Sequence, residues 1–308
     1  MTLAPRVVLV HRRTELDELL DQHGTRGQAE FFLRTRGRTL AEVQARHDLQ
    51  ADALSTVSAA VPVDWRRGSV ERADLTRFVF EPGDVVAVVG QDGLVANVAK
   101  YLDGQPVIGV DPEPGRNPAV LVRHSAAAAG TLLVSAVTGR AVVEHRTMVH
   151  AQLDDGQALD SLNEVYVGHV SHQSARYRLA IAGLGEPERQ SSSGLIVATG
   201  TGATGWTASI SHDRGAPLPL PAPQDPALAW FVREAWPSPA TGTSLTAGLL
   251  GSGGDLLLVV ESSELVVFGD GLESDRLVAT WGQTVDVSVS ARTLALVTAS
   301  PDAGRSTR

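Results

Sequence analysis

Two apolar runs joined by a glycine-bounded turn and a short helix constrain this chain more than any other feature of its sequence. Val85–Val89 is continuously apolar, the pattern of a strand buried on both faces. Gly90–Gly93 predicts a tight turn, Leu94–Leu102 a helix, and Pro106–Val110 a second buried strand. Since the connections are short, the segment is a β-α-β unit, which requires a parallel sheet with a right-handed crossover.

The flanking sequence extends this α/β region. Val7–Val10 predicts a first strand, and Thr14 with Asp17 predicts a helix start. Further expected elements are a helix starting at the Thr39/Glu42 capping box, a strand over Val57–Val63, connector and helix over 64–78, and a helix from Ser125 to about Thr138.

Beyond Gly139 the pattern changes to short strands separated by turns, which is typical of an all-β sandwich. We therefore expect an α/β domain with a parallel, Rossmann-like sheet over 1–139 and a β-rich domain over 140–298. The polar residues 299–308 are expected to form a disordered tail. The expected strands are Val142–Leu153, Glu164–Val170, Tyr177–Ile181, Leu195–Ala198, Leu256–Val260, Leu265–Phe268, Arg276–Thr280 and Val285–Val289, with a proline-rich loop over 215–226.

Charge and composition limit the classes of partner. The formal net charge of −9 argues against a nucleic-acid or anionic-membrane partner, because both need a basic footprint. The chain has no cysteine, which removes disulfides, cysteine metal sites and thiol nucleophiles. No apolar run reaches membrane-spanning length, and residues 1–6 have no signal-peptide character, so we expect a cytoplasmic protein.

The turn Gly90-Gln91-Asp92-Gly93 is the first candidate site. It follows a parallel strand at its carboxyl end, where open α/β sheets bind ligands. Its glycines let main chain approach a phosphate, and a carboxylate there can orient or deprotonate a hydroxyl. A plain Asp-Gly turn explains the same four residues equally well.

A second glycine-rich turn, Gly200–Gly205, matches the pattern G-x-G-x-x-G and follows a strand. A dinucleotide fingerprint also needs a further strand ending in an acidic residue about 20 positions on, and here the chain becomes proline-rich instead. We therefore interpret this segment as a turn whose backbone touches a flat ligand. Trp206 beyond it suits stacking on a base or packing in the core equally well.

Two polar pairs complete the inventory. Asn163-Glu164 opens a strand, where an amide beside a carboxylate can bracket a ribose diol, although a simple polar strand end is the commoner explanation. His169 and His172 lie three apart, so on a strand they face opposite sides, and we expect no metal site.

In their order and spacing these motifs resemble the NAD kinase family. That family has a Gly-Gly-Asp-Gly turn after a buried strand, then an Asn-Glu pair, then an apolar strand entering a Thr-Gly-Ser-Thr-Ala-Tyr turn. Here the counterparts are Gly90–Gly93, Leu162–Val165, Gly194–Thr199 and Thr201–Trp206. Details that resemble the mitochondrial-type branch are Pro106–Pro112, Ser192–Gly194, Trp206, Arg233-Glu234 and Phe268–Gly271, and the similarity runs from about Val7 to about Val297.

The resemblance implies transfer of a phosphoryl group from ATP, or polyphosphate, to the 2′-hydroxyl of the adenosine ribose of NAD, with Mg²⁺ on the donor. It implies a nucleotide-binding α/β domain, a β-rich NAD-binding domain and a homodimer or homotetramer. It gives Asp92 the role of the base or hydroxyl-orienting residue. The residues it implies for ligand binding are Gly90, Gln91, Gly93, Asn163, Glu164, Thr201, Gly202, Thr204, Gly205 and Trp206.

The chain departs from the family pattern mainly in the first turn. Gln91 stands in place of glycine, which adds a side chain and disfavours a positive φ, and Leu94 stands in place of threonine. Ala203 and Gly205 replace serine and alanine. We therefore expect the NAD pocket to be better preserved than the donor site.

Three hypotheses remain at this point: an NAD kinase, a catalytically weak NAD- or NADP-binding sensor or regulatory module, and a related kinase that acts on a lipid or another hydroxyl. Gln91 favours the sensor, whereas Asp92 with Asn163 and Glu164 favours the kinase. The Asn-Glu pair indicates a dinucleotide more than a lipid.

Overall fold

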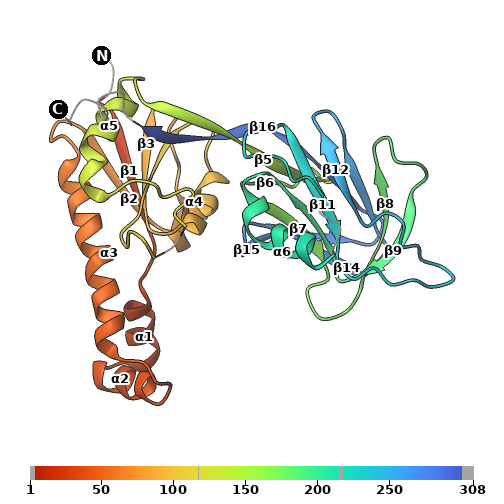
Figure 1. The fold of residues 1–308 in the computed structure, drawn as a ribbon, viewed down its shortest axis with the longest axis horizontal. Coiled ribbons are helices and arrows are strands. Elements are labelled where there is room, and N and C mark those ends of the chain that lie inside the picture. The colour runs from red at the N-terminus through yellow and green to blue at the C-terminus, as the bar shows by residue number, and fades with distance from the viewer. Residues whose placement is uncertain (1–3, 117, 215–217, 300–308) are drawn as a thin grey trace. The chain divides into compact units, whose positions relative to one another are not determined.

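The computed structural model describes residues 4–116, 118–214 and 218–299. It shows a mixed α/β fold with a parallel-containing sheet and a separate antiparallel sheet (Figure 1). The chain forms two compact units, Met1–Glu144 with Ala295–Arg308, and His145–Leu294. The expected border near residue 139 thus lies close to Glu144, but the end of the chain returns to the first unit. Ala299 belongs to a strand, and the remainder of the predicted disordered tail lies outside the described residues.

The sheet of the first unit is parallel. Its order is β2-β1-β3-β4, and Ala295 and Leu296 of β16 pair in parallel with the free side of β4. The predicted β-α-β unit is confirmed, because β3 and β4 are parallel with α4 between them in sequence. The bounds are β1 Arg6–His11, β2 Arg66–Glu71, β3 Asp84–Val89, α4 Asp92–Ala99, β4 Pro106–Val110 and β16 Thr284–Ala299.

Helices lie on both faces of this sheet. The long α3 (Leu40–Ala60) and α5 (Ala129–Val137) share one apolar cluster with alternate residues of β1 and β3. Helix α4 packs against β4 and the 3-10 helix η1 (Arg72–Arg77), on the other side (Figure 1). Before α5, Ala126–Ala128 form the 3-10 helix η2, and the Ser125 side chain makes no capping hydrogen bond.

Two expectations for this unit are wrong. Val57 lies near the end of α3, fully buried against the sheet, so the strand over Val57–Val63 does not form. The helix extends through this segment because Ala53 and Val57 lie four residues apart on the face that packs in the core of the unit. Residues 64–78 contain the strand β2 as well as a helix, and its charged sequence concealed it.

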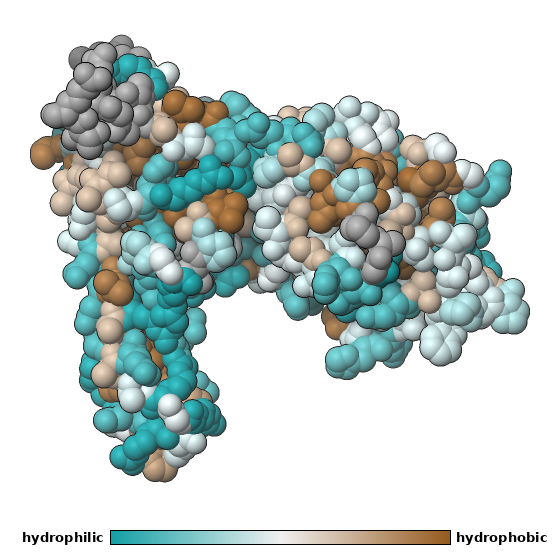
Figure 2. Space-filling model, in the orientation of Figure 1, coloured by the Kyte–Doolittle hydropathy of each residue, from teal (hydrophilic) through white to brown (hydrophobic). Residues whose placement is uncertain are grey.

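Helices α1 (Glu15–His23) and α2 (Arg26–Arg34) form a hairpin against the start of α3 with a small apolar core of their own. Thr14 caps α1 through a capping box with Asp17, as predicted. The outer surface of this hairpin is mostly hydrophilic (Figure 2).

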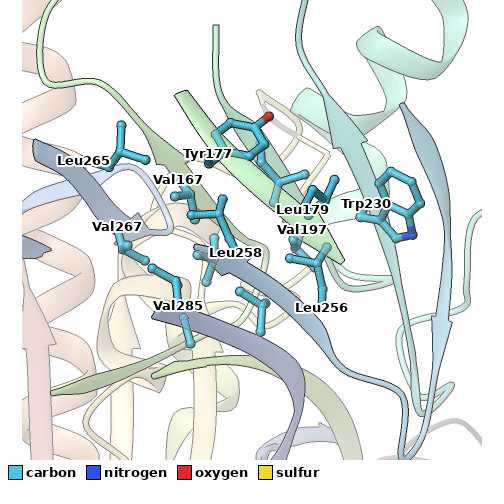
Figure 3. Close-up of a cluster of buried hydrophobic side chains, with 14 of the residues drawn as sticks. Val167, Tyr177, Leu179, Val197, Trp230, Leu256, Leu258, Leu265, Val267 and Val285 are labelled. Atoms are coloured by element: carbon cyan, nitrogen blue, oxygen red, sulfur yellow. The ribbon is translucent and has the colours of Figure 1, made fainter. Parts of the chain in front are cut away.

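The second unit is built around a core between two layers of strands. One layer is the antiparallel sheet β12-β11-β10-β7-β14-β15, and the other contains β9-β8-β13-β16 with β5 and β6. Alternate residues of both layers meet in one cluster that includes Val167, Tyr177, Trp230 and Leu258 (Figure 3). The bounds are β5 Val142–Leu153, β6 Ala158–Ser161, β7 Glu164–Gly168, β8 Ala175–Ile181, β9 Glu188–Ser192, β10 Leu195–Ala198, β11 Ala227–Val232, β12 Ala247–Gly251, β13 Leu256–Val260, β14 Glu264–Gly269 and β15 Leu272–Thr280.

This unit is not purely β. The 3-10 helix η3 (Gly202–Thr204) leads into α6 (Trp206–Asp213), which the all-β expectation missed, as it missed β6, β9, β11 and β12. Residues 218–226 of the proline-rich loop form no helix or strand, and residues 215–217 lie outside the described part. No helix in the described part of the chain combines the length and the apolar character needed to cross a membrane.

Candidate functional site

The turn between β3 and α4 lies at the carboxyl edge of the parallel sheet. Gly90 donates its N–H to Val110 O at 3.0 Å, which joins the turn to the end of β4. A Cβ on Gly90 would approach the Leu94 side chain to 3.0 Å, so this position favours glycine. Asp92 is the first residue of α4, and Gly93 is exposed within its first turn.

The Asp92 carboxylate is held by main chain. Oδ1 accepts hydrogen bonds from Leu121 N at 2.8 Å and Val122 N at 3.0 Å, and Oδ2 accepts one from Val120 N at 2.9 Å. A carboxylate has about four lone-pair positions, and the described residues occupy three of them, two on Oδ1 and one on Oδ2. Asp92 therefore fixes the segment after β4 in addition to any part it has in chemistry.

Gln91 does not strain the turn. It is the N-cap of α4 with φ −105° and ψ 164°, an extended conformation that any residue adopts, and its side chain is exposed. The positive φ that a glutamine disfavours is therefore not required at this position. Leu94 is buried at 3% exposure, so its side chain serves packing.

A cavity of about 110 Å³ opens beside this turn within the first unit. Its basic residues are Arg12, Arg13, Arg46 and His47, and Glu15 and Glu113 are its acidic ones. Arg46 pairs with Glu15 at 3.1 Å. The remaining lining residues are Thr14, Val43, Gln50, Gly90, Gln91 and Pro112.

The charges of this cavity suit an anion such as a phosphate. Sequence reasoning missed it, although Arg12 and Arg13 directly follow the first strand and so stand at the same sheet edge as Gln91. Arg13 is already paired with Asp21 at 2.5 Å, which leaves Arg12 as the more accessible cation of the two.

In the second unit the structure brings two predicted segments together. Thr199 donates its N–H to Asn163 O at 2.9 Å and its hydroxyl to Leu162 O at 2.5 Å. The same hydroxyl accepts hydrogen bonds from Thr201 N at 3.1 Å and Gly202 N at 3.3 Å. Thr199 therefore joins the glycine-rich turn to the Asn163-Glu164 pair.

The two segments meet too closely for a side chain at Gly202. A Cβ there would lie 2.3 Å from Asn163 O, so glycine is required. Thr201 is buried and its hydroxyl has no hydrogen-bond partner, whereas Thr204 and Gly205 are exposed. The structure thus brings the glycine-rich turn into direct contact with the segment that carries Asn163 and Glu164.

The pKa of the Glu164 carboxyl is raised above its ordinary value. Burial and the neighbouring Asp270 raise the pKa of its carboxyl to about 7, with burial the larger cause. A carboxyl with this pKa can donate a hydrogen bond to a ligand oxygen when protonated and accept one from a hydroxyl when ionised.

Trp206 is part of an aromatic platform, which we define as Tyr166, Trp206 and Phe268. The Tyr166 ring stacks on Trp206 at 5.8 Å between centroids and packs at a tilt on Phe268 at 5.1 Å. Arg233 lies 5.1 Å from the Trp206 ring. Trp206 remains 37% exposed, so of its two interpretations, core packing and stacking on a base, the exposure disfavours core packing.

Two glycines make room for this platform. A Cβ on Gly168 would lie 2.1 Å from the Tyr166 hydroxyl, and one on Gly194 would lie 2.7 Å from the Tyr166 ring. The Tyr166 hydroxyl donates to Ser193 O at 2.9 Å. The Tyr166 ring is therefore held in place by its hydrogen bond to Ser193 O and by close contact with Gly168 and Gly194.

Within the described residues, no group of three or more His, Asp or Glu side chains is arranged to hold a metal ion. His169 Nδ1 instead accepts a hydrogen bond from Ser171 N at 3.1 Å. Mg²⁺ carried by donor phosphates needs only one or two protein carboxylates, so the site residues are compatible with it.

The predicted site residues are thus divided between the units. Gly90, Gln91, Asp92 and Gly93 belong to the first, and Asn163, Glu164 and the turn ending at Trp206 to the second. Comparison with known proteins found no family model that matches this chain and no curated protein that matches it.

Proposed function

We propose that this protein is an NAD kinase that transfers a phosphoryl group from ATP, or polyphosphate, to the 2′-hydroxyl of the adenosine ribose of NAD. The observation that carries the proposal is the hydrogen-bonded junction at Thr199, which joins the Asn163-Glu164 pair to the glycine-rich turn. An amide, a carboxyl and exposed main chain beside an aromatic platform suit a ribose and an adenine.

The proposed chemistry uses few groups. Asn163 and Glu164 hold the ribose hydroxyls, and Trp206 offers a stacking face for the base. Phosphoryl transfer depends mainly on position and charge neutralisation, which Mg²⁺ on the donor supplies. As the new P–O bond forms and the bond to the leaving phosphate breaks, the 2′-hydroxyl loses its proton, and the acceptor assigned to that proton in this proposal is the Asp92 carboxylate.

The basic cavity beside Gln91 supports a phosphate donor in the first unit. The substrates NAD and ATP, a homodimer or homotetramer and a cytoplasmic location belong to the same proposal.

One observation favours a second candidate, an NAD- or NADP-binding sensor. Three main-chain N–H groups occupy the Asp92 carboxylate, which suits a structural residue better than a free base. Gln91 no longer distinguishes the two, because its conformation is ordinary.

The test is NADP formation by purified protein with NAD, ATP and Mg²⁺, repeated with polyphosphate. Asp92→Asn and the control Asp111→Asn are assayed beside the wild type, at a temperature where all three are folded. NADP formed by the wild type and the control, but reduced at least about 100-fold in Asp92→Asn, supports a kinase with Asp92 as its base. NAD binding without NADP formation from either donor would instead establish the sensor.

A further inference from the structure

The turn between β14 and β15 is made by Asp270 and Gly271, which connect the paired residues Gly269 and Leu272. Their φ angles are +54° and +64°, the two positive values of a type I′ hairpin turn, for which Asp-Gly is a preferred sequence. The turn therefore accounts for the backbone of Asp270. Its side chain has a further use.

That use is visible in its hydrogen bonds. Asp270 Oδ2 accepts from Leu162 N at 2.9 Å, and Oδ1 accepts from Asn163 N at 2.7 Å. Its own N–H donates to Glu164 O at 3.1 Å. One residue thus holds the main chain on both sides of the Asn163 side chain.

Thr199 binds the same segment as a hydrogen-bond donor, whereas the Asp270 side chain binds it as an acceptor. Thr199 donates to Leu162 O and Asn163 O, while Asp270 accepts from the N–H groups of the same two residues. All four main-chain polar groups of Leu162 and Asn163 are therefore satisfied by two residues. Only the side chains of Asn163 and Glu164 remain for a ligand.

The hairpin also approaches this segment very closely. A Cβ on Gly269 would lie 1.5 Å from Ser161 Oγ, so only glycine fits there. Asp270 also acts on Glu164 by charge, since it contributes to the raised pKa of that carboxyl. The residues paired at this point of the sheet are uncharged, since Ala198 pairs with Glu164 on β10 and Gly269 lies opposite Val165 on β14. Asp270 is the charged group that acts on the pKa of Glu164.

We propose that Asp270 is a positioning residue of the acceptor site, which fixes the main chain of Leu162 and Asn163 so that the Asn163 and Glu164 side chains face the ribose of NAD. This inference rests on the proposed function. Asp270 acts through its neighbours, and we assign it no contact with the substrate.

Two variants test it. Asp270→Asn is nearly isosteric but keeps only one acceptor oxygen, and Asp270→Gly removes the side chain while relieving the positive φ. The matched control is Asp154→Asn in the same unit, whose carboxylate also accepts two hydrogen bonds, from Thr284 N and the Gln283 amide.

The first measurement is hydrogen exchange of the peptide that covers residues 161–165, which needs no ligand. We expect exchange at least about 10-fold faster in both Asp270 variants and unchanged in Asp154→Asn. The second is the Kd for NAD, which we expect to rise about 10-fold or more in both Asp270 variants, as for the loss of a charged hydrogen bond. The KM for NAD should rise more than kcat falls.

The pH dependence of NAD binding distinguishes a positioning role of Asp270 from a general loss of folded structure in its variants. Since the pKa of Glu164 is raised to about 7, we expect NAD binding by the wild type to change with a limb near pH 7. Asp270→Asn removes the neighbouring negative charge, so this limb should move to lower pH, which a merely structural role would not cause.

Wild-type exchange and wild-type affinity in both Asp270 variants would overturn the inference. The two proposals fail in different proteins. The kinase proposal is tested in the wild type alone, whereas the positioning role of Asp270 is tested by comparing the Asp270 variants with the wild type. A wild type that binds NAD without forming NADP removes the kinase and leaves the positioning role measurable by affinity. A wild type that does not bind NAD overturns both.

Discussion

Replacement of Asp92 by asparagine should destabilise the first unit as well as affect chemistry. The carboxylate accepts three main-chain N–H groups of the segment after β4, two on Oδ1 and one on Oδ2. Asparagine keeps a single carbonyl oxygen, and its amide N–H₂ must then face an N–H donor. Hydrogen bonds to a charged group contribute about 1.5–3 kcal/mol each, so we expect Asp92→Asn to lower the free energy of unfolding by about 1.5–3 kcal/mol.

A loss of this size should lower Tm by roughly 3–10 °C for a unit of this length. Differential scanning calorimetry measures it directly. The matched control is Asp111→Asn, because Asp111 follows β4 and its Oδ1 accepts one such bond, from Glu113 N at 2.9 Å. An asparagine carbonyl can accept that bond, so the control should change the free energy of unfolding by less than about 0.5 kcal/mol.

A Tm of Asp92→Asn within about 1 °C of the wild type would refute this reasoning. It would mean that the three contacts contribute little and that the carboxylate is available for chemistry. A large loss would mean that an inactive Asp92→Asn enzyme proves a catalytic role only if its folded state is first demonstrated.

Three further predictions follow from single contacts. Gln91→Gly should relieve no backbone strain and change the free energy of unfolding by less than about 0.5 kcal/mol in urea unfolding, because Gln91 makes no capping hydrogen bond and glycine is tolerated at an N-cap. Higher turnover of this variant would show that the Gln91 side chain crowds the donor. Gly168→Ala should displace the Tyr166 ring, because the added Cβ would overlap the Tyr166 hydroxyl, and so change the fluorescence of Trp206, which stacks on that ring. An unchanged emission spectrum with unchanged NAD affinity would show that Gly168 does not set the position of the Tyr166 ring. Because the folded pKa of Glu164 is raised to about 7, its favourable contribution is complete below pH 4.5 and is lost as the pH rises through 7. Glu164→Gln should therefore be more stable than the wild type at pH 8, by up to on the order of 3 kcal/mol, and about equal to it near pH 4. No pH dependence of this difference in urea unfolding would contradict the shift.

The parts of the fold that sequence predicted are those with strong local signals. The buried strands β3 and β4 and the capped helices α1 and α3 follow from apolar runs and capping boxes. The wrong strand at Val57 arose because β-branched residues also occupy helix positions that face a core. The charged strand β2 escaped notice because its conformation comes from pairing with β1, which no local pattern records.

The same limit applies to the site. Each motif residue stood out by itself, but the contacts between motifs are long-range. Thr199 bonds to residues 36 or 37 positions away, and Asp270 to residues more than 100 positions away. Asp270 appeared in the sequence only as part of a hairpin turn, because its left-handed backbone and its two acceptor bonds exist only in the folded state.

The return of the chain to the first unit has a consequence for synthesis. Val297 belongs to the apolar core of that unit, and its carbonyl oxygen lies 2.8 Å from His124 Nε2. At about 5–20 residues per second, a ribosome needs roughly 10–30 s to make the second unit before this segment emerges. Until then β4 is an uncovered sheet edge, which is the kind of surface that pairs with other chains. A chain that stops before Ala295 should therefore aggregate through its N-terminal unit, although that unit's own N-terminal sequence is intact.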